Sequence, residues 1–266
     1  MTGSDGKGPS GPKTTLGKTA AGKTAAGKTA AGKTTLGKAG GTRKAAVRVR
    51  KAKKMSLSSK LWLERQLNDP YVAEAQRLGF RSRAAFKLLQ LDDRFHFLQP
   101  GRIVIDLGAA PGGWTQVAAD RVKQPRGLVV GLDYLAMEPV PGTVFLQMDF
   151  LDPGAPAALM AELAAHAAGR KQADVVLSDM AAPTTGHNAT DHLRIIGLAE
   201  TAYHFAAEIL APGGAFVAKV FQGGSERELL SRLKQDFTEV RHVKPPASRT
   251  GSAEMYVVAT GFRGGG

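Results

Sequence analysis

One lysine, Lys219, lies within the apolar stretch 216–221, whose composition and length predict a central strand covered on both faces. A lysine is almost never fully buried without a partner. Desolvation lowers the pKa of a lysine and a neighbouring carboxylate raises it, and the sequence leaves open which effect is larger here. Near the end of its strand, Lys219 could instead extend its aliphatic stem to solvent. A partly desolvated lysine in this position is a candidate general base.

Asp179 is the natural partner of Lys219, because it follows the apolar stretch 175–178 and would lie at the same edge of a parallel sheet. Glu254 opens the last apolar stretch and could approach that edge as well. Lys87 stands on an early predicted helix among apolar residues, and taken alone it is best interpreted as an ordinary solvated lysine.

The segment 106–114 reads Asp-Leu-Gly-Ala-Ala-Pro-Gly-Gly-Trp and follows the apolar residues 103–105. It predicts a buried strand that breaks at Gly108, where a glycine lets the backbone approach a bound molecule. Ligands of open α/β sheets lie at the carboxyl ends of the strands. The glycine spacing is not G-x-G-x-x-G, which disfavours pyrophosphate binding and a nicotinamide-dependent dehydrogenase. By itself, the segment would also fit a plain strand-to-helix turn.

Aspartates end several of the predicted strands. They are Asp106, Asp133, Asp149 and Asp179. A single one is usually a turn residue or a helix cap, but four at one sheet edge suggest a polar ligand that lies across it. Asp133 could accept both hydroxyls of a ribose, and Asp149 could accept from an exocyclic amine. Together they suit an adenosine.

The elements that must position these residues begin near residue 56, and residues 56–266 are expected to form one domain. Two helices are predicted within 58–80, and Ser82 is the expected N-cap of a third helix. Strands and helices then alternate. The predicted strands are 102–106, 127–133, 144–148, 174–179, 215–221, 239–243 and 255–260, and the predicted helices are 114–121, 157–167, 192–210 and 226–237. This alternation predicts an α/β fold with a mostly parallel seven-stranded sheet, helices on both faces, and the last two strands paired at an edge.

The positive charge of the chain lies in its first part. The net charge is +13, and residues 1–54 hold 14 Lys and Arg against one acid, while the rest holds 22 of each sign. This part repeats Ala-Ala-Gly-Lys-Thr and has few large apolar residues, so residues 1–55 are predicted to be a disordered basic tail. Such a tail either attracts phosphate backbones without reading sequence or is a solvated extension with no specific partner.

Several classes of protein are disfavoured by the composition. Segments 17–24, 22–29 and 27–34 each match the phosphate-loop pattern G-x-x-x-x-G-K-T, but one repeating unit generates all three and no strand precedes them. The absence of cysteine excludes disulfides and thiolate metal sites, and the scattered histidines form no ligand set, so no metal is expected. No apolar run reaches the roughly 18 residues of a membrane span. A cytoplasmic monomer is expected.

Five ordered segments of the chain resemble the FtsJ/RrmJ-type ribose 2′-O-methyltransferases. They are 82–88, 106–114, 178–180, 216–223 and 254–259, and Asp-Pro-Tyr-Val at 69–72 fits as well. The resemblance covers about 68–263, and the tail lies outside it. It implies a Rossmann-like fold that uses S-adenosylmethionine as methyl donor.

The resemblance also implies roles for individual residues. A catalytic Lys-Asp-Lys-Glu tetrad falls on Lys87, Asp179, Lys219 and Glu254. The methyl donor is placed against Gly112, Trp114, Asp133, Asp149 and Asp179. The implied partner is RNA. The chain is similar to bacterial members that methylate a uridine ribose in the A-loop of 23S rRNA within the assembled large ribosomal subunit.

One segment departs from the family pattern. After Asp179-Met180-Ala181 the family usually continues with Pro-Asn, whereas this chain has Ala182-Pro183. The change affects the rim of the donor pocket and leaves the tetrad intact. Two alternatives stay open at this point: ribose methylation of tRNA, which related enzymes perform with the same tetrad, and a non-catalytic RNA-binding factor in ribosome assembly. An intact tetrad argues against the second.

Overall fold

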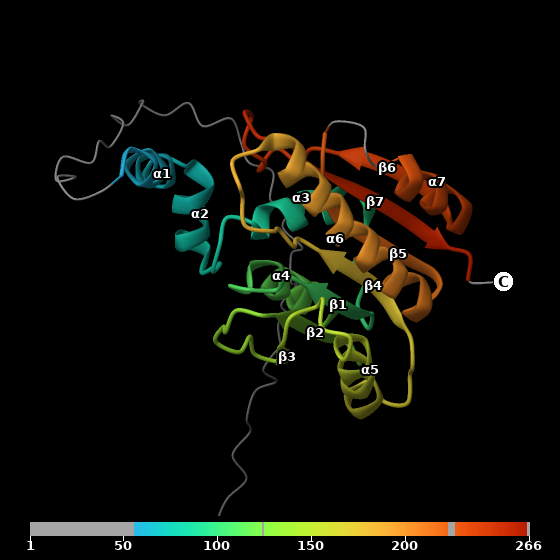
Figure 1. The fold of residues 1–266 in the computed structure, drawn as a ribbon. Coiled ribbons are helices and arrows are strands. Elements are labelled where there is room, and N and C mark those ends of the chain that lie inside the picture. The colour runs from blue at the N-terminus through green and yellow to red at the C-terminus, as the bar shows by residue number, and fades with distance from the viewer. Residues whose placement is uncertain (1–55, 124, 223–226, 265–266) are drawn as a thin grey trace, which may run out of the picture. The chain divides into compact units, whose positions relative to one another are not determined.

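The computed structural model describes residues 56–123, 125–222 and 227–264 (Figure 1). The predicted tail, with its three phosphate-loop-like repeats, lies outside the described residues. Within the described part of the chain, no helix combines the length and the apolar character that a membrane crossing needs.

A seven-stranded sheet organises the fold, in the order β3-β2-β1-β4-β5-β7-β6. Its strands are β1 (Ile103–Leu107), β2 (Leu128–Asp133), β3 (Val144–Gln147), β4 (Ala173–Ser178), β5 (Leu210–Phe221), β6 (Phe237–Val243) and β7 (Glu254–Phe262). Strands β1 to β5 pair in parallel, and β7 pairs antiparallel with both β5 and β6. The predicted α/β class and mostly parallel sheet are confirmed. The last two strands do pair, but β7 lies inside the sheet and only β6 forms the edge.

Helices cover both faces of the sheet (Figure 1). They are α1 (Leu57–Leu67), α2 (Pro70–Leu78), α3 (Ala85–Phe95), α4 (Gly113–Val122), α5 (Ala155–His166), α6 (Asn188–Ile209) and α7 (Arg227–Asp236). Alternate residues of β1 point to opposite faces. Ile103 and Ile105 pack with α5, α6 and α7, whereas Val104 packs with α3 and α4. This second layer, α3 and α4, is the one that borders the predicted site residues.

The break between α1 and α2 has a local cause. The side chain of Asp69 accepts a hydrogen bond from the Tyr71 amide, and Pro70 occupies the first position of α2, where its missing N–H has no cost. Helix α2 then ends at Gly79, which adopts a φ of +76°. The two helices predicted within 58–80 are confirmed.

The predicted cap of α3 is wrong. Helix α3 follows Ala84, which makes no side-chain cap, and Ser82 lies two residues earlier. The hydroxyl of Ser82 is buried without a hydrogen-bond partner among the described residues. It packs against Gly113, where a Cβ would come within 2.3 Å of the Ser82 Oγ. The start of α3 is therefore set by close packing against the start of α4.

Candidate active site

The four residues of the predicted tetrad come from different elements and meet at the carboxyl edge of β4. Lys219 of β5 places its Nζ 2.9 Å from Asp179 Oδ1 and donates a hydrogen bond of 2.7 Å to the Asp179 carbonyl. Lys87 of α3 places its Nζ 2.7 Å from one oxygen of Glu254 and 2.8 Å from the other. All four side chains are at most 15% exposed. The structure therefore brings the four together as two ion pairs.

Tyr256 joins these two ion pairs. Its hydroxyl donates to Asp179 Oδ1 at 2.6 Å and accepts from Lys87 Nζ at 3.1 Å. Burial, together with the charges of Asp179 and Glu254, raises the pKa of Tyr256 well above its ordinary value, so the phenol keeps its proton and stays a donor. Sequence reasoning missed this residue. A usable signal was its spacing of two from Glu254, which places both side chains on one face of β7.

Asp179 is the anion at the centre of the cluster. Burial is the largest single effect on its pKa and raises it. The charges of Lys219 and Lys87 and the hydrogen bonds from Tyr256 and Lys219 lower the pKa, and together they outweigh burial. The pKa of Asp179 therefore lies below its ordinary value. The carboxylate is therefore charged and can hold the Nζ of Lys219 in place.

A cavity of about 470 Å³ opens beside the cluster, along the carboxyl ends of β1, β2 and β4. Residues from five segments line it: Gly108, Ala110, Leu132, Asp133, Tyr134, Leu135, Asp149, Phe150, Leu151, Asp179, Met180, Ala181, Ala182, Pro183 and Leu198. Asp179 belongs both to this lining and to the tetrad, so the cavity reaches the Lys219–Asp179 pair at its carboxylate. We call it the donor cavity.

Gly108 shapes one wall of the donor cavity. It has a φ of +80°, and a Cβ there would come within 3.0 Å of the backbone of Met180. Only glycine combines that conformation with so close an approach. The expected break at Gly108 is therefore present, and it brings the ends of β1 and β4 together.

Two of the predicted carboxylates, Asp133 and Asp149, also hold the loops around the donor cavity. Asp133 accepts hydrogen bonds from the amides of Ala110 at 2.9 Å and Leu135 at 2.8 Å, and Asp149 accepts from the Leu151 amide at 3.0 Å. Each carboxylate oxygen has two lone pairs. Both side chains can therefore fix their loops and still accept hydrogen bonds from a ligand.

Asp106 does not join the other aspartates, contrary to the expectation that all four lie across the edge. Strand β1 continues to Leu107, so Asp106 lies within the strand, fully buried. Its side chain accepts a hydrogen bond of 2.7 Å from the Thr115 hydroxyl of α4, and its Oδ1 has no hydrogen-bond partner among the described residues. Burial, with smaller contributions from Asp179 and Asp133, raises the pKa of Asp106 to about 7.

Gly112 and Trp114 lie outside the lining of the donor cavity. Trp114 is buried, donates from its indole nitrogen to the Ala84 carbonyl at 2.9 Å and packs against the ring of Tyr256, with 5.5 Å between ring centroids. Gly112 has a φ of +106°, and a Cβ there would come within 2.9 Å of Arg81. Both residues therefore pack against the segment at the start of α3. Their expected contacts with the methyl donor stay predictions.

Arg81, which sequence reasoning also missed, holds two loops beside the donor cavity. Its guanidinium donates to the carbonyls of Pro111, Glu138 and Pro139, the last at 2.8 Å. The first carbonyl belongs to the loop after β1 and the other two belong to the loop between β2 and β3. Both loops also supply residues to the donor cavity, so Arg81 braces its walls from outside.

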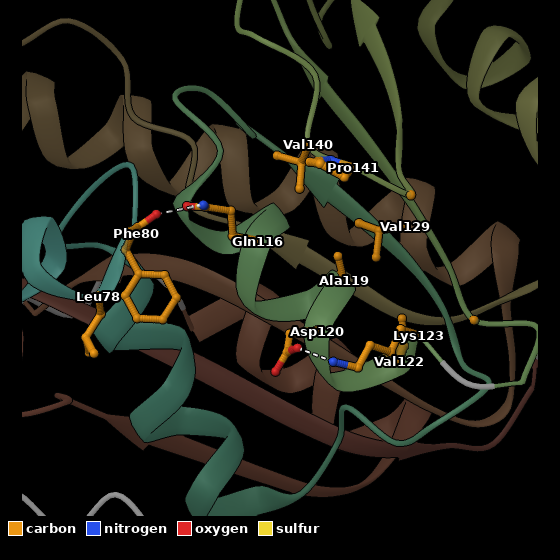
Figure 2. A pocket seen from close by; sticks show the side chains of 13 residues that line it. Leu78, Phe80, Gln116, Ala119, Asp120, Val122, Lys123, Val129, Val140 and Pro141 are labelled. Carbon is orange, nitrogen blue, oxygen red and sulfur yellow. Dashed lines mark hydrogen bonds and ion pairs between the residues drawn. The ribbon is translucent and has the colours of Figure 1, made fainter.

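A second cavity, of about 420 Å³, lies behind these loops, and Figure 2 shows the side chains that line it. They are mostly apolar, among them Phe80, Val129 and Val140. Gln116 accepts from the Arg81 amide and donates to the Gly79 carbonyl, and Asp120 pairs with Lys123. None of the predicted site residues lines this cavity. The described part of the chain also holds no group of three or more metal-ligating side chains.

Comparisons with known proteins agree with this geometry. The family model described as FtsJ-like methyltransferase matches residues 80–262. A "Ribosomal RNA large subunit methyltransferase E" from Paramagnetospirillum magneticum is 65% identical over 230 residues, which cover 85% of this chain and 92% of that protein. A protein of the same name from Parvibaculum lavamentivorans is 59% identical, covering 85% and 90%.

A solved structure shows the same fold. The crystal structure of a ribosomal RNA methyltransferase from Plasmodium falciparum is 31% identical, covers 70% of this chain and 100% of its own, and superimposes with a TM-score of 0.63. The family of the chain follows from the match over residues 80–262, and the seven-stranded sheet with a cavity at its carboxyl edge agrees with it. The chain belongs to the FtsJ-like methyltransferase family.

Proposed function

We propose that the protein methylates a ribose 2′-hydroxyl of ribosomal RNA with S-adenosylmethionine as donor, and that its target is a uridine in the A-loop of 23S rRNA in the large subunit. The observation that carries the proposal is the ion pair of Lys219 with Asp179, whose residue also lines the donor cavity. The names of the relatives support ribosomal RNA of the large subunit as the substrate.

The donor cavity fits S-adenosylmethionine in size and chemistry. Its volume falls within the roughly 300–1,000 Å³ of small-molecule sites. Asp133, Asp149 and Asp179 contribute carboxylates, which suit the hydroxyl and amino groups of the donor and its positive sulfonium. Leu132, Phe150 and other apolar side chains supply a surface for a flat base. When bound, the donor supplies an electrophilic methyl group.

The residues of the cluster then have separable roles. Lys219, in its neutral form, accepts the proton of the 2′-hydroxyl at its Nζ while the oxygen attacks. Asp179 fixes the direction of that lysine through the contacts described above. Lys87 and Glu254 hold the ribose, and the phenol of Tyr256 keeps both ion pairs in register. Holding the reacting groups in line can lower the barrier by about 7–11 kcal/mol.

A labelling experiment tests this proposal. Large ribosomal subunits from cells that lack the protein are incubated with the full chain and S-adenosylmethionine labelled in its methyl group. We expect one alkali-resistant 2′-O-methyl label, on a uridine of the 23S A-loop, and no label on tRNA from the same cells. Label on tRNA alone would favour the tRNA alternative. Unlabelled RNA despite measurable donor binding would favour the non-catalytic factor.

The brace at Arg81 gives a further prediction. Arg81→Ala removes its hydrogen bonds to the three loop carbonyls. We expect the dissociation constant for S-adenosylmethionine to rise about tenfold, because hydrogen bonds from a charged donor are lost and the loops must be ordered by the ligand itself. Isothermal titration without RNA measures this directly. Arg77→Ala is the matched control, since Arg77 pairs with Glu74 on its own helix. Equal affinities in both variants would contradict the bracing role.

A further inference from the structure

Ser248 lies in the segment 244–253 between β6 and β7, a segment that we call the β6–β7 loop. Its side chain is buried, with the residue 7% exposed, and its hydroxyl lies 2.8 Å from Glu254 Oε1. A carboxylate oxygen accepts and a hydroxyl donates. Ser248 therefore donates a charge-assisted hydrogen bond to a member of the tetrad, although it reaches neither the donor cavity nor Asp179.

This hydrogen bond completes the contacts of the Glu254 carboxylate. Lys87 Nζ lies within 2.8 Å of both carboxylate oxygens, and Ser248 adds a contact to Oε1 alone. An ammonium group is a compact charge that sets distance better than direction. The hydroxyl approaches from another element, so it fixes the rotation of the carboxylate that the lysine leaves free.

The β6–β7 loop is itself tied to the region that carries Lys87. The Ala247 amide donates to Gln90 Oε1 of α3 at 2.7 Å, and Arg83, just before α3, donates to the Ala247 carbonyl. The Ser248 amide donates to the Pro245 carbonyl at 2.8 Å. These contacts hold the backbone beside the serine relative to α3, and so they hold its hydroxyl near the Lys87–Glu254 pair.

We propose that Ser248 is a positioning residue for methyl transfer, whose hydroxyl orients the Glu254 carboxylate so that Lys87 is held in register with Asp179 and the acceptor ribose. The inference rests on the proposed function. The contact chain runs from Ser248 through Glu254 to Lys87, and from Lys87 through the Tyr256 hydroxyl to Asp179. A small rotation at its start changes where the acceptor ribose sits against the donor, and reaction rates are sensitive to such misplacement.

Single-turnover kinetics of Ser248→Ala test the proposal. We expect the rate constant of transfer to fall about tenfold, the cost of one hydrogen bond to a charged group, with the dissociation constant for S-adenosylmethionine unchanged. Ser248→Thr keeps the hydroxyl and should recover most of the rate. Thr250→Ala is the matched control in the same loop, because Thr250 is exposed and its hydrogen bond with Lys244 uses its backbone carbonyl. It should stay within about twofold of the parent, as surface changes usually do.

A double-mutant cycle separates this role from a general loosening of the loop. In a Glu254→Ala background, Ser248→Ala should have no further effect, because its action passes through the missing carboxylate. Multiplicative effects, or a Ser248→Ala rate equal to the parent rate while Glu254→Ala is slow, would overturn the inference and leave the proposed function standing. No 2′-O-methyl label on the large subunit with the parent chain itself would instead overturn the proposed function. Thermal melts of all variants verify that each is folded.

Discussion

Lys219→Ala is expected to stop methyl transfer while S-adenosylmethionine still binds with nearly its original affinity. The variant removes the group proposed to accept the proton of the 2′-hydroxyl, and general-base help alone accounts for about 10²–10⁴-fold in rate. Lys219 is not among the residues that line the donor cavity, so its loss leaves that lining unchanged. Rapid-quench single-turnover assays on large ribosomal subunits measure the rate, and isothermal titration measures donor binding.

Lys219→Ala is also expected to change the folding stability of the protein. Lys219→Ala leaves Asp179 buried beside Tyr256 without its nearest cation, so a loss of stability is expected as well. A melting curve determines the temperature at which the variant is fully folded, and the assay is run below it. Lys234→Ala, on the exposed side of α7, controls for the loss of a lysine. Transfer by Lys219→Ala at the parent rate would refute the assignment of the base.

Asp106→Asn is expected to remove a large pH dependence of folding stability. The pKa of Asp106 is about 7 in the folded protein, against an ordinary value of 3.8, because burial penalises the charged form. Between these two pH values the folded state keeps a proton that the unfolded chain releases, so stability falls as pH rises and levels off above 7. The total loss is on the order of 4 kcal/mol. Asparagine stays neutral throughout and can still accept from Thr115.

Urea unfolding at pH 5 and pH 8 measures this difference. At pH 5 the parent aspartate is protonated in the fold but mostly charged in the unfolded chain, so asparagine should bring a gain that is smaller than at pH 8. At pH 8 the variant should be the more stable protein by a few kcal/mol. Asp120→Asn, at an exposed ion pair with Lys123, is the control and should follow the parent at both pH values. If the curves of Asp106→Asn and parent stay parallel between pH 5 and 8, Asp106 is charged in the fold.

The sheet could be predicted from the sequence because its signals are local. Apolar stretches followed by aspartates mark where β2 and β4 end, and the structure places Asp133 and Asp179 at those ends. The meeting of Lys219 with Asp179 follows from two such ends in neighbouring parallel strands. Glu254 was expected near this edge because it opens the last apolar stretch, whereas Lys87 carries no comparable local signal and only the family resemblance pointed to it.

The features that sequence reasoning missed depend on distances between segments far apart in the chain. Asp106 lies within β1, because the strand runs one residue further than expected, and its side chain accepts from Thr115 of α4, a residue nine positions later in the chain. Ser82 was expected to cap α3, but the approach of Gly113 decides its position. The role of Arg81 cannot be predicted from the sequence, because it depends on the loop after β1 and the loop between β2 and β3 lying close enough for one guanidinium to donate to both. Such closeness is a property of the packed molecule.

The position of β7 inside the sheet affects how the protein folds during its synthesis on the ribosome. Six of the seven strands are synthesised before it, yet β7 contributes Glu254 and Tyr256 and pairs with two neighbours. Until its residues emerge, β5 has an unpaired border that can attach to other chains, and Lys87 has no carboxylate to pair with. We therefore expect a prematurely terminated chain that lacks β7 to be inactive and prone to aggregation.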